Sequence, residues 1–295
     1  KIDKRTNQPS GIVKLEKPIE VIFEGVDLTT YKTIKPPNPK NIDLSEIKES
    51  FCYLFVGHWM EGVIGHDRKN VGVLVKEFYE TFKDYKGSKP ALILKASVGT
   101  SSYISREAIL DKIGKIKRSI NSKNLPNVYL LSGEFNDNEI NELYNHSKVK
   151  AMVTITKGEG FGRPLLEFST TGKPIIASGW SGHLDFLNPS FTTLLPGTLE
   201  NVHPSSANAW LIPESKWFQV SSKHLRKSLK DVFKKYKEYS IKGKQQKQYV
   251  KTNFSWDKMS SLIISILDDK NKVPEMAQEV KLELPTFSLP KLKKV

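Results

Sequence analysis

Short, continuously apolar runs alternate with stretches of helical periodicity from residue 50 onward. Apolar runs of about four to eight residues predict buried strands, and apolar residues every three to four positions predict helices. Strands are expected over residues 51–57, 91–97, 127–133, 151–156 and 174–178. Helices are expected over residues 71–82, 104–120, 137–147, 163–172, 222–240 and 256–268.

This alternation indicates repeated βα units. It predicts an α/β fold, a Rossmann-like parallel sheet with helices on both faces. Ligands of such sheets bind beside the carboxyl ends of the strands. The sequence KGEGFG at residues 157–162 lies at such an end, between one predicted strand and the helix predicted over 163–172. This loop is therefore the first candidate for a binding site.

The flanks and one internal segment lack this alternation. Residues 1–50 contain one plausible strand, IEVIFEG at 19–25, followed by the breaker-rich PPNPKN, which is typical of a linker. Residues 196–221 combine prolines and tryptophans with little periodicity, and we interpret them as an ordered loop or insertion. The tail over 271–295 is expected to be extended.

The formal net charge is +14 at pH 7, which suggests an anionic partner. However, 40 of the 46 basic residues are lysine, whereas base readers and phosphate forks favour arginine. The densest region, residues 223–251, also has the apolar spacing of an amphipathic helix with its lysines facing water. A solvated lysine surface is therefore favoured, and binding to nucleic acid or to a membrane surface is the less favoured alternative.

The single cysteine, Cys52, lies inside the apolar run FCYLFVG. One cysteine excludes a disulfide within the chain and a metal cage of cysteines, so a reducing, cytoplasmic setting fits best. No apolar run approaches the roughly 18 to 20 residues that span a bilayer. The chain begins with Lys1 and shows no signal-peptide pattern, which suggests a processed or truncated chain.

Three glycines alternate along the candidate loop, at Gly158, Gly160 and Gly162. Glycine allows positive φ and a close approach of the backbone to a ligand. Pro164 is typical of the first turn of a helix, whose free N–H groups favour an anion by about 0.3 to 1 kcal/mol. The pattern therefore indicates a phosphate site. It matches neither the P-loop motif nor a full GxGxxG, so ATPase and nicotinamide-binding functions are disfavoured.

Two glutamates accompany the loop: Glu159 lies within it, and Glu167 lies about one turn into the predicted helix. Because a carboxylate is repelled by phosphate, both glutamates are better suited to accept hydrogen bonds from sugar hydroxyls. A phosphate beside a polyol indicates a nucleotide sugar. The competing interpretation is a helix-start glutamate and a surface glutamate, neither of which binds a ligand.

The stretch EGFGRPLLE, from Glu159 to Glu167, resembles the EGFGxPxxE signature of retaining GT-B glycosyltransferases of the family-4 (group 1) type. GKPIIAS followed by GWSGHLDFL resembles the strand and turn that come next in that family. Further resemblance is carried by IFEGVDLTTY, FVGH and DRKNVGVLVKEF. It covers about residues 20–190 and is specific over 150–186.

The resemblance implies three catalytic residues, Glu159, Lys69 and Arg68. Glu159 would hold hydroxyls of the donor sugar, while Lys69, with Arg68 beside it, would neutralise the diphosphate. Glu167 would bind the ribose. The other implied donor-binding residues are Gly133 and Glu134 near the base, with Gly158, Gly160, Phe161, Gly162 and Arg163 in the loop. Without the resemblance, Arg68 and Lys69 are equally compatible with a solvated helix start.

Two features depart from the family pattern. His58 follows FVG where the family usually has arginine, and an insertion, WMEGVIGHD, precedes Arg68. More importantly, the resemblance implies only the C-terminal, donor-binding half of a GT-B fold. We therefore expect a remnant of the N-terminal half and a linker over 1–50, a nucleotide-sugar-binding domain with C-terminal helices over 51–270, and a tail over 271–295.

The first hypothesis is retaining transfer of a sugar from a nucleoside-diphosphate sugar to an unknown acceptor. The nucleotide sugar is a substrate and no cofactor is expected; no D-x-D occurs in the chain, so no metal is expected either. A second hypothesis is a catalytically incomplete donor-binding subunit or half of a split enzyme, completed by an N-terminal domain, a partner chain or a homo-oligomer. A third is a transferase acting on DNA or an anionic polymer.

Overall fold

The computed structural model describes residues 19–34, 41–60, 63–206, 211–212 and 214–268. The chain divides into two compact units, Phe23–Met259 and Lys1–Ile22 with Ser260–Val295. The first unit contains the sheets and nearly all of the helices, and the site lies within it. Most of the expected linker PPNPKN and the whole expected tail lie outside the described residues.

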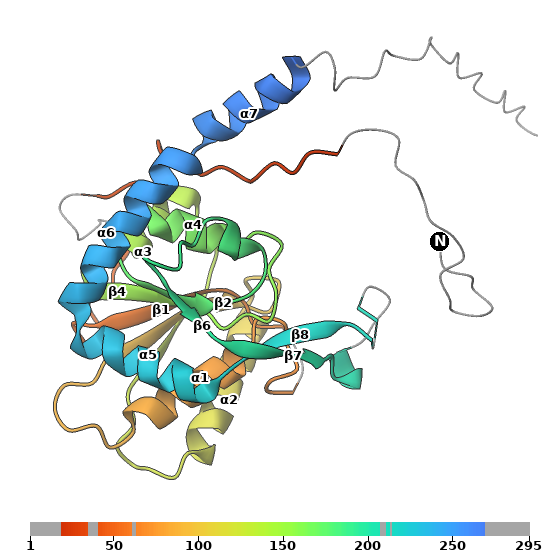
Figure 1. Ribbon diagram of the computed structural model, residues 1–295. Coiled ribbons are helices and arrows are strands. Elements are labelled where there is room, and N and C mark those ends of the chain that lie inside the picture. The colour runs from red at the N-terminus through yellow and green to blue at the C-terminus, as the bar shows by residue number, and fades with distance from the viewer. Residues whose placement is uncertain (1–18, 35–40, 61–62, 207–210, 213, 269–295) are drawn as a thin grey trace, which may run out of the picture. The chain divides into compact units, whose positions relative to one another are not determined.

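Six parallel strands form the main sheet, in the order β3-β2-β1-β4-β5-β6 (Figure 1). The strands are β1 (Cys52–His58), β2 (Ala91–Ser97), β3 (Val128–Leu131), β4 (Val149–Val153), β5 (Ile175–Ser178) and β6 (Thr193–Leu195). The helices are α1 (Val71–Phe82), α2 (Tyr103–Ser119), α3 (Asp137–Asn145), α4 (Arg163–Ser169), α5 (Ser222–Lys234), α6 (Tyr236–Asn253) and α7 (Trp256–Asp268). The predicted fold class is confirmed.

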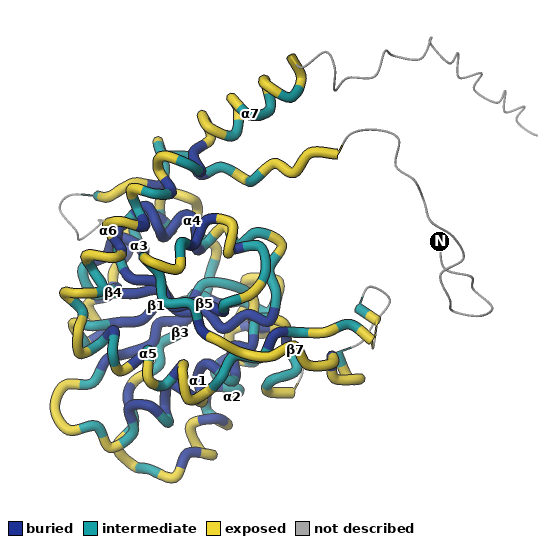
Figure 2. Tube along the Cα trace, in the orientation of Figure 1, coloured by how far each residue is buried: buried dark blue, intermediate teal, exposed yellow. Residues whose placement is uncertain are grey.

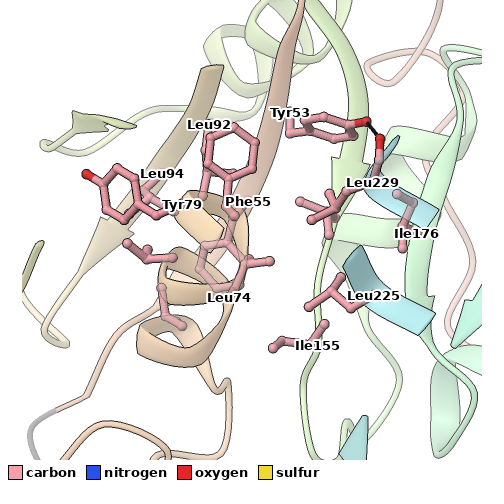
Figure 3. Close-up of a cluster of buried hydrophobic side chains, with 14 of the residues drawn as sticks. Tyr53, Phe55, Leu74, Tyr79, Leu92, Leu94, Ile155, Ile176, Leu225 and Leu229 are labelled. Atoms are coloured by element: carbon pink, nitrogen blue, oxygen red, sulfur yellow. Dashed lines mark hydrogen bonds between the residues drawn. The ribbon is translucent and has the colours of Figure 1, made fainter. Parts of the chain in front are cut away.

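Helices cover both faces of this sheet because its side chains alternate between two apolar clusters. In β1, Tyr53 and Phe55 join the cluster that contains α1, α2 and α5. Cys52 and Leu54, on the opposite face, join the cluster that contains α3, α4 and the end of α6. Figure 3 shows part of the first cluster, in which the Tyr53 hydroxyl donates a 2.6 Å hydrogen bond to the Leu229 carbonyl of α5. The burial along the chain in Figure 2 follows the same pattern, with dark-blue strands at the centre.

The strand predicted over 19–25 is wrong. The described residues there form no strand, and a single β-bridge joins Val26 to Ser255, beyond α6. Gly25 fits this path closely, since a Cβ there would lie 2.8 Å from the Ser255 carbonyl oxygen. Most apolar side chains of the stretch are exposed, Ile19 at 66%, Val21 at 87% and Ile22 at 41%, and only Phe23 among them packs against the cluster with α3 and α4.

Residues 196–221, expected as an ordered loop or insertion, contain an antiparallel hairpin. Its strands are β7 (Gly197–Asn201) and β8 (Lys216–Val220). Every residue of β7 is exposed, so its sequence lacks the alternation of a half-buried strand. Gly197 allows the close pairing, because a Cβ there would lie 2.0 Å from the Gln219 carbonyl oxygen.

The helix predicted over 222–240 is two helices, α5 and α6, separated at Lys235, and the second runs on to Asn253. The sequence concealed α6 because two of its three buried positions, Gly243 and Gln246, are not apolar. Gly243 lies against the end of α4, where a Cβ would stand 2.5 Å from the Gly172 carbonyl oxygen. The Gln246 side chain donates to the Phe186 carbonyl at 2.6 Å.

Candidate functional site

The predicted loop lies where expected, between the carboxyl end of β4 and the start of α4. Beside it, the carboxyl end of β1 leads through the insertion to Arg68, Lys69 and helix α1. A small pocket between these segments is lined by Val56, Lys69, Met152, Val153, Thr154, Glu159, Gly162, Pro164 and Leu165. Sequence positions about 90 residues apart therefore meet at one edge of the sheet.

Glu159 is the centre of an ion-pair cluster. Its Oε1 accepts a hydrogen bond from Lys69 Nζ at 2.5 Å, and its Oε2 lies 3.1 Å from an Arg68 guanidinium nitrogen. The same guanidinium nitrogen donates to the Gly158 carbonyl at 2.5 Å. Burial acts to raise the pKa of Glu159, but the Lys69 ammonium and the Arg68 guanidinium hold it below its ordinary value. The three predicted catalytic residues are thus in direct contact, with the carboxylate ionised.

Ser181, in the turn after β5, fixes the backbone of the loop. The Glu159 amide donates to Ser181 Oγ at 2.9 Å, and that hydroxyl donates to the Glu159 carbonyl at 2.6 Å. The next residue must be glycine, because a Cβ at Gly182 would lie 1.9 Å from the Gly160 carbonyl oxygen. Sequence reasoning missed Ser181, whose only signal was its place in GWSGHLDFL.

The loop glycines differ from the expectation that all three allow positive φ. Only Gly162, with φ of 96°, lies in the left-handed region, so the prediction is wrong for Gly158 and Gly160. At these two positions the structure shows open space beside the backbone and not a positive φ angle. A Cβ at Gly160 would meet no atom within 4 Å, and one at Gly158 would meet only Ser181 Oγ, at 3.9 Å. The loop therefore presents bare backbone, while Phe161 packs against Phe186 with ring centroids 5.0 Å apart.

Glu167 occupies a different environment from Glu159. Its side chain is 10% exposed on α4, accepts a 3.3 Å hydrogen bond from the Tyr144 hydroxyl and lies 3.4 Å from the Arg163 guanidinium. Burial raises the pKa of Glu167 to about 7, although Arg163 and the Tyr144 hydroxyl act in the opposite direction. The structure thus brings Arg163 and Glu167 together, in a site where Glu167 titrates near neutral pH.

Gly133 and Glu134 lie beyond the carboxyl end of β3, at the edge of the sheet and three strands from β4. The Gly133 carbonyl accepts a 2.7 Å hydrogen bond from Lys95 Nζ. A hollow at this point is lined by Ser101, Ser102, Tyr103, Arg106 and the residues from Leu130 to Gly133. Both predicted residues therefore share the carboxyl edge of the sheet with the loop, and Gly133 lines a hollow separate from the loop.

A larger hollow lies at the opposite edge of the sheet, where Phe51, Lys89 and Asn127 precede β1, β2 and β3. It contains none of the predicted site residues.

His58 is the last residue of β1. Its side chain is exposed, and its Nδ1 lies 2.9 Å from Ser97 Oγ. Within the described residues, no group of three or more His, Cys, Asp or Glu side chains is arranged to hold a metal ion. No helix of the described parts combines the length and apolar character needed to cross a membrane.

The sheet order, with the loop at the carboxyl edge of the sheet, is that of the C-terminal half of a GT-B fold. The C-terminal domain of a glycosyl transferase group 1 family protein from Francisella tularensis has this fold, with a TM-score of 0.53 and 15% identity, over 79% of this chain and 100% of that chain. Residues 111–213, which include the loop and Glu167, match the family model of glycosyl transferases group 1. The predicted resemblance is confirmed.

Two longer structures share the fold. HepE from Anabaena in complex with UDP-glucose matches with a TM-score of 0.57 and 16% identity, over 84% of this chain and 57% of that chain. Sucrose-phosphate synthase from Thermosynechococcus elongatus matches with a TM-score of 0.56 and 15% identity, over 84% of this chain and 51% of that chain. This chain therefore spans little more than half of each. No curated protein matches it by sequence.

Proposed function

We propose that the chain is the donor-binding half of a retaining, family-4 type glycosyltransferase, and that it binds a nucleoside-diphosphate sugar. The observation that carries the proposal is the contact between Glu159, Lys69 and Arg68 beside bare loop backbone, at the ligand-binding edge of a parallel sheet. The HepE structure, which shares the fold, contains UDP-glucose. A uridine nucleotide is therefore the first donor to test.

The chemical demand of the reaction is the negative charge that grows on the departing diphosphate. Preorganised cations and backbone amides stabilise such charge. Lys69 and Arg68 supply the cations, and the backbone of residues 158–162 supplies the amides. Once the diphosphate attracts these cations, the Glu159 carboxylate becomes available to accept hydrogen bonds from hydroxyls of the donor sugar.

The acceptor hydroxyl would attack the anomeric carbon of the donor sugar from the same face from which the diphosphate leaves. A diphosphate oxygen would take the proton of that hydroxyl. This step gives retention without a protein nucleophile. It also requires no metal, since the two cations perform the role that a metal ion has in other transferases. In this proposal Glu167, which accepts a hydrogen bond from the Tyr144 hydroxyl, binds the ribose when its carboxyl group is ionised. A cytoplasmic location is part of the same proposal, supported by the single buried cysteine, Cys52.

Isothermal titration calorimetry of the purified chain with UDP, UDP-glucose and other nucleotide sugars tests the proposal, with and without EDTA. We expect binding of at least one nucleotide sugar that EDTA leaves unchanged. As a control, Lys76→Met alters an exposed lysine of α1 outside the site and should bind like the wild type. Absence of binding to every common nucleotide sugar, or its loss in EDTA, contradicts the proposal.

A second function is favoured by the length of the match, since this chain spans 51% and 57% of the two longer structures. It is a donor-binding subunit that is inactive until an acceptor-binding half is supplied by another domain, a partner chain or a second copy. Transfer assays on the monomer, alone and with the candidate partner, separate the two functions. Turnover by the monomer alone contradicts this second function and shows that the chain catalyses transfer by itself.

A further inference from the structure

Lys157 is a buried lysine directly before the glycines of the loop. Only 2% of the residue is exposed. Its ammonium donates a hydrogen bond to the Gly65 carbonyl and lies 4.9 Å from the centroid of the Trp217 ring. Burial lowers the pKa of Lys157, while the nearby Asp67 carboxylate acts in the opposite direction. A lysine is rarely buried this far unless its charge is compensated, so these contacts explain its position.

The backbone of Lys157 joins the same two segments as its side chain. Its amide donates a 2.8 Å hydrogen bond to the Arg68 carbonyl, and its carbonyl accepts a 3.1 Å hydrogen bond from the Phe218 amide. Gly65 belongs to the insertion, Arg68 follows it on the way to α1, and Phe218 belongs to β8 of the hairpin. Lys157 therefore connects the loop to both segments that border it.

The segment that Lys157 holds is the one that carries the two cations. Arg68 and Lys69 stand between Asp67, one of whose buried carboxylate oxygens has no partner among the described residues, and Asn70, which has a left-handed φ of 57°. A non-glycine residue in that region costs energy that the surroundings must supply. The ammonium of Lys157 offsets the Asp67 charge and fixes the Gly65 carbonyl three residues upstream of Arg68.

We propose that Lys157 is a positioning residue that, with Trp217, holds Arg68 and Lys69 in place to meet the diphosphate of the donor. This inference rests on the proposed function and adds a role for the insertion and the β7–β8 hairpin. Lys157 does not itself touch the ligand in this role. It acts through the segment it anchors, so its loss should weaken phosphate recognition and leave recognition of the nucleoside unchanged.

The test compares binding of UDP and uridine by wild type, Lys157→Met and Lys157→Arg. Methionine keeps much of the packing volume but removes the charge and the donor, and we expect UDP affinity to fall about tenfold, the scale of one cation–π contact. Uridine affinity should not change. Arginine can still donate to Gly65 and lie over Trp217, so it should recover most of the UDP affinity. Trp217→Leu should lower UDP affinity less than Lys157→Met does.

Lys150→Met is the matched control. Lys150 precedes the centre of β4, with its ammonium 5.9 Å from the Tyr236 ring centroid, outside the site. Like Lys157→Met, it removes an ammonium that lies over an aromatic ring, and it should not lower UDP affinity. If Lys157→Met leaves UDP affinity unchanged, or lowers UDP and uridine affinities equally, Lys157 has only a structural role and the inference is overturned.

Amide hydrogen exchange of the unliganded proteins keeps this inference separate from the proposed function. In Lys157→Met, exchange should accelerate over residues 64–70 and 216–219, and Lys150→Met should show no such change. If the wild type binds no UDP, the proposed function fails, whereas accelerated exchange at Arg68 and Lys69 still supports the anchoring role. Unchanged exchange in Lys157→Met overturns that role whatever the ligand result.

Discussion

Glu167→Gln should make the protein more stable at neutral pH, by an amount that grows as the pH rises. Burial raises the pKa of Glu167 from an ordinary 4.5 to about 7. Because the folded-state pKa is the higher one, the unfolded chain loses its proton first as the pH increases. Between about pH 4.5 and pH 7 the folded state therefore binds more protons than the unfolded state, and the free energy of unfolding falls with pH.

The increase in the pKa of Glu167 from 4.5 to about 7 corresponds to a loss of about 3 kcal/mol in the free energy of unfolding once the carboxyl group is ionised in both states. This value is an upper bound for the variant, since glutamine keeps an acceptor for the Tyr144 hydroxyl but loses the pairing with Arg163. We expect Glu167→Gln to gain about 1 to 3 kcal/mol relative to wild type between pH 5 and pH 8. Almost all of this gain should appear below pH 7.5.

Urea denaturation of both proteins at half-unit pH intervals measures the effect. Glu238→Gln, which alters an exposed glutamate on α6, is the control and should track the wild type at every pH. A stability difference between Glu167→Gln and wild type that stays constant from pH 5 to pH 8 would refute the reasoning, because it would mean that the carboxyl group does not titrate in this range. UDP binding offers a second readout: affinity should rise with pH more steeply in the wild type than in the variant, since only the ionised carboxylate can accept hydrogen bonds from both ribose hydroxyls.

The remaining predictions concern the other charged groups and the chain as a whole. Lys69→Met should weaken UDP binding by about 1 to 3 kcal/mol and leave uridine binding unchanged, as measured by calorimetry; equal losses would exclude phosphate as its partner. Glu159→Gln should weaken UDP-glucose binding more than UDP binding, and an equal effect on both would show that Glu159 does not bind the sugar. The purified monomer should transfer sugar slowly or not at all without an added N-terminal half, in a radiolabelled-donor assay. Binding to duplex DNA should be weak at 150 mM salt, and a steep salt dependence with tight binding would instead support a nucleic acid acceptor.

Sequence periodicity predicted five of the six strands because these five are short apolar runs, four of which, β1, β2, β4 and β5, are largely buried. Periodicity failed to predict elements whose residues are exposed or whose buried residues are not apolar. Strand β7 is exposed throughout, and α6 is anchored by Gly243 and Gln246, so neither has an apolar pattern to detect. Residues 19–25 show the opposite error, since the stretch contains apolar residues but forms no strand of either sheet.

Some residues of the candidate site could likewise be predicted from the sequence, and others could not. The EGFG motif and its glutamates were recognisable because the chemistry of a ligand restricts which residue types can be used. That Lys69 and Arg68 share a single carboxylate could not be predicted, because it depends on how the insertion returns to the loop. Lys157 was overlooked for a related reason: a lysine in a lysine-rich chain is expected to face water, and only its three-dimensional surroundings show that it is buried.

The ion-pair cluster also limits how the donor can bind. Lys69 Nζ and Glu159 Oε1 are 2.5 Å apart and both side chains are largely buried, so a diphosphate that draws Lys69 toward itself weakens this contact. A diphosphate carries more negative charge than one carboxylate, which favours transfer of the cations to the ligand. In the proposed complex, Glu159 then lacks its cationic partners and lies beside the sugar, whose hydroxyl groups are the donors that replace them. A free nucleoside diphosphate lacks these hydroxyls, so the cluster itself favours the complete nucleotide sugar over the product that remains after transfer.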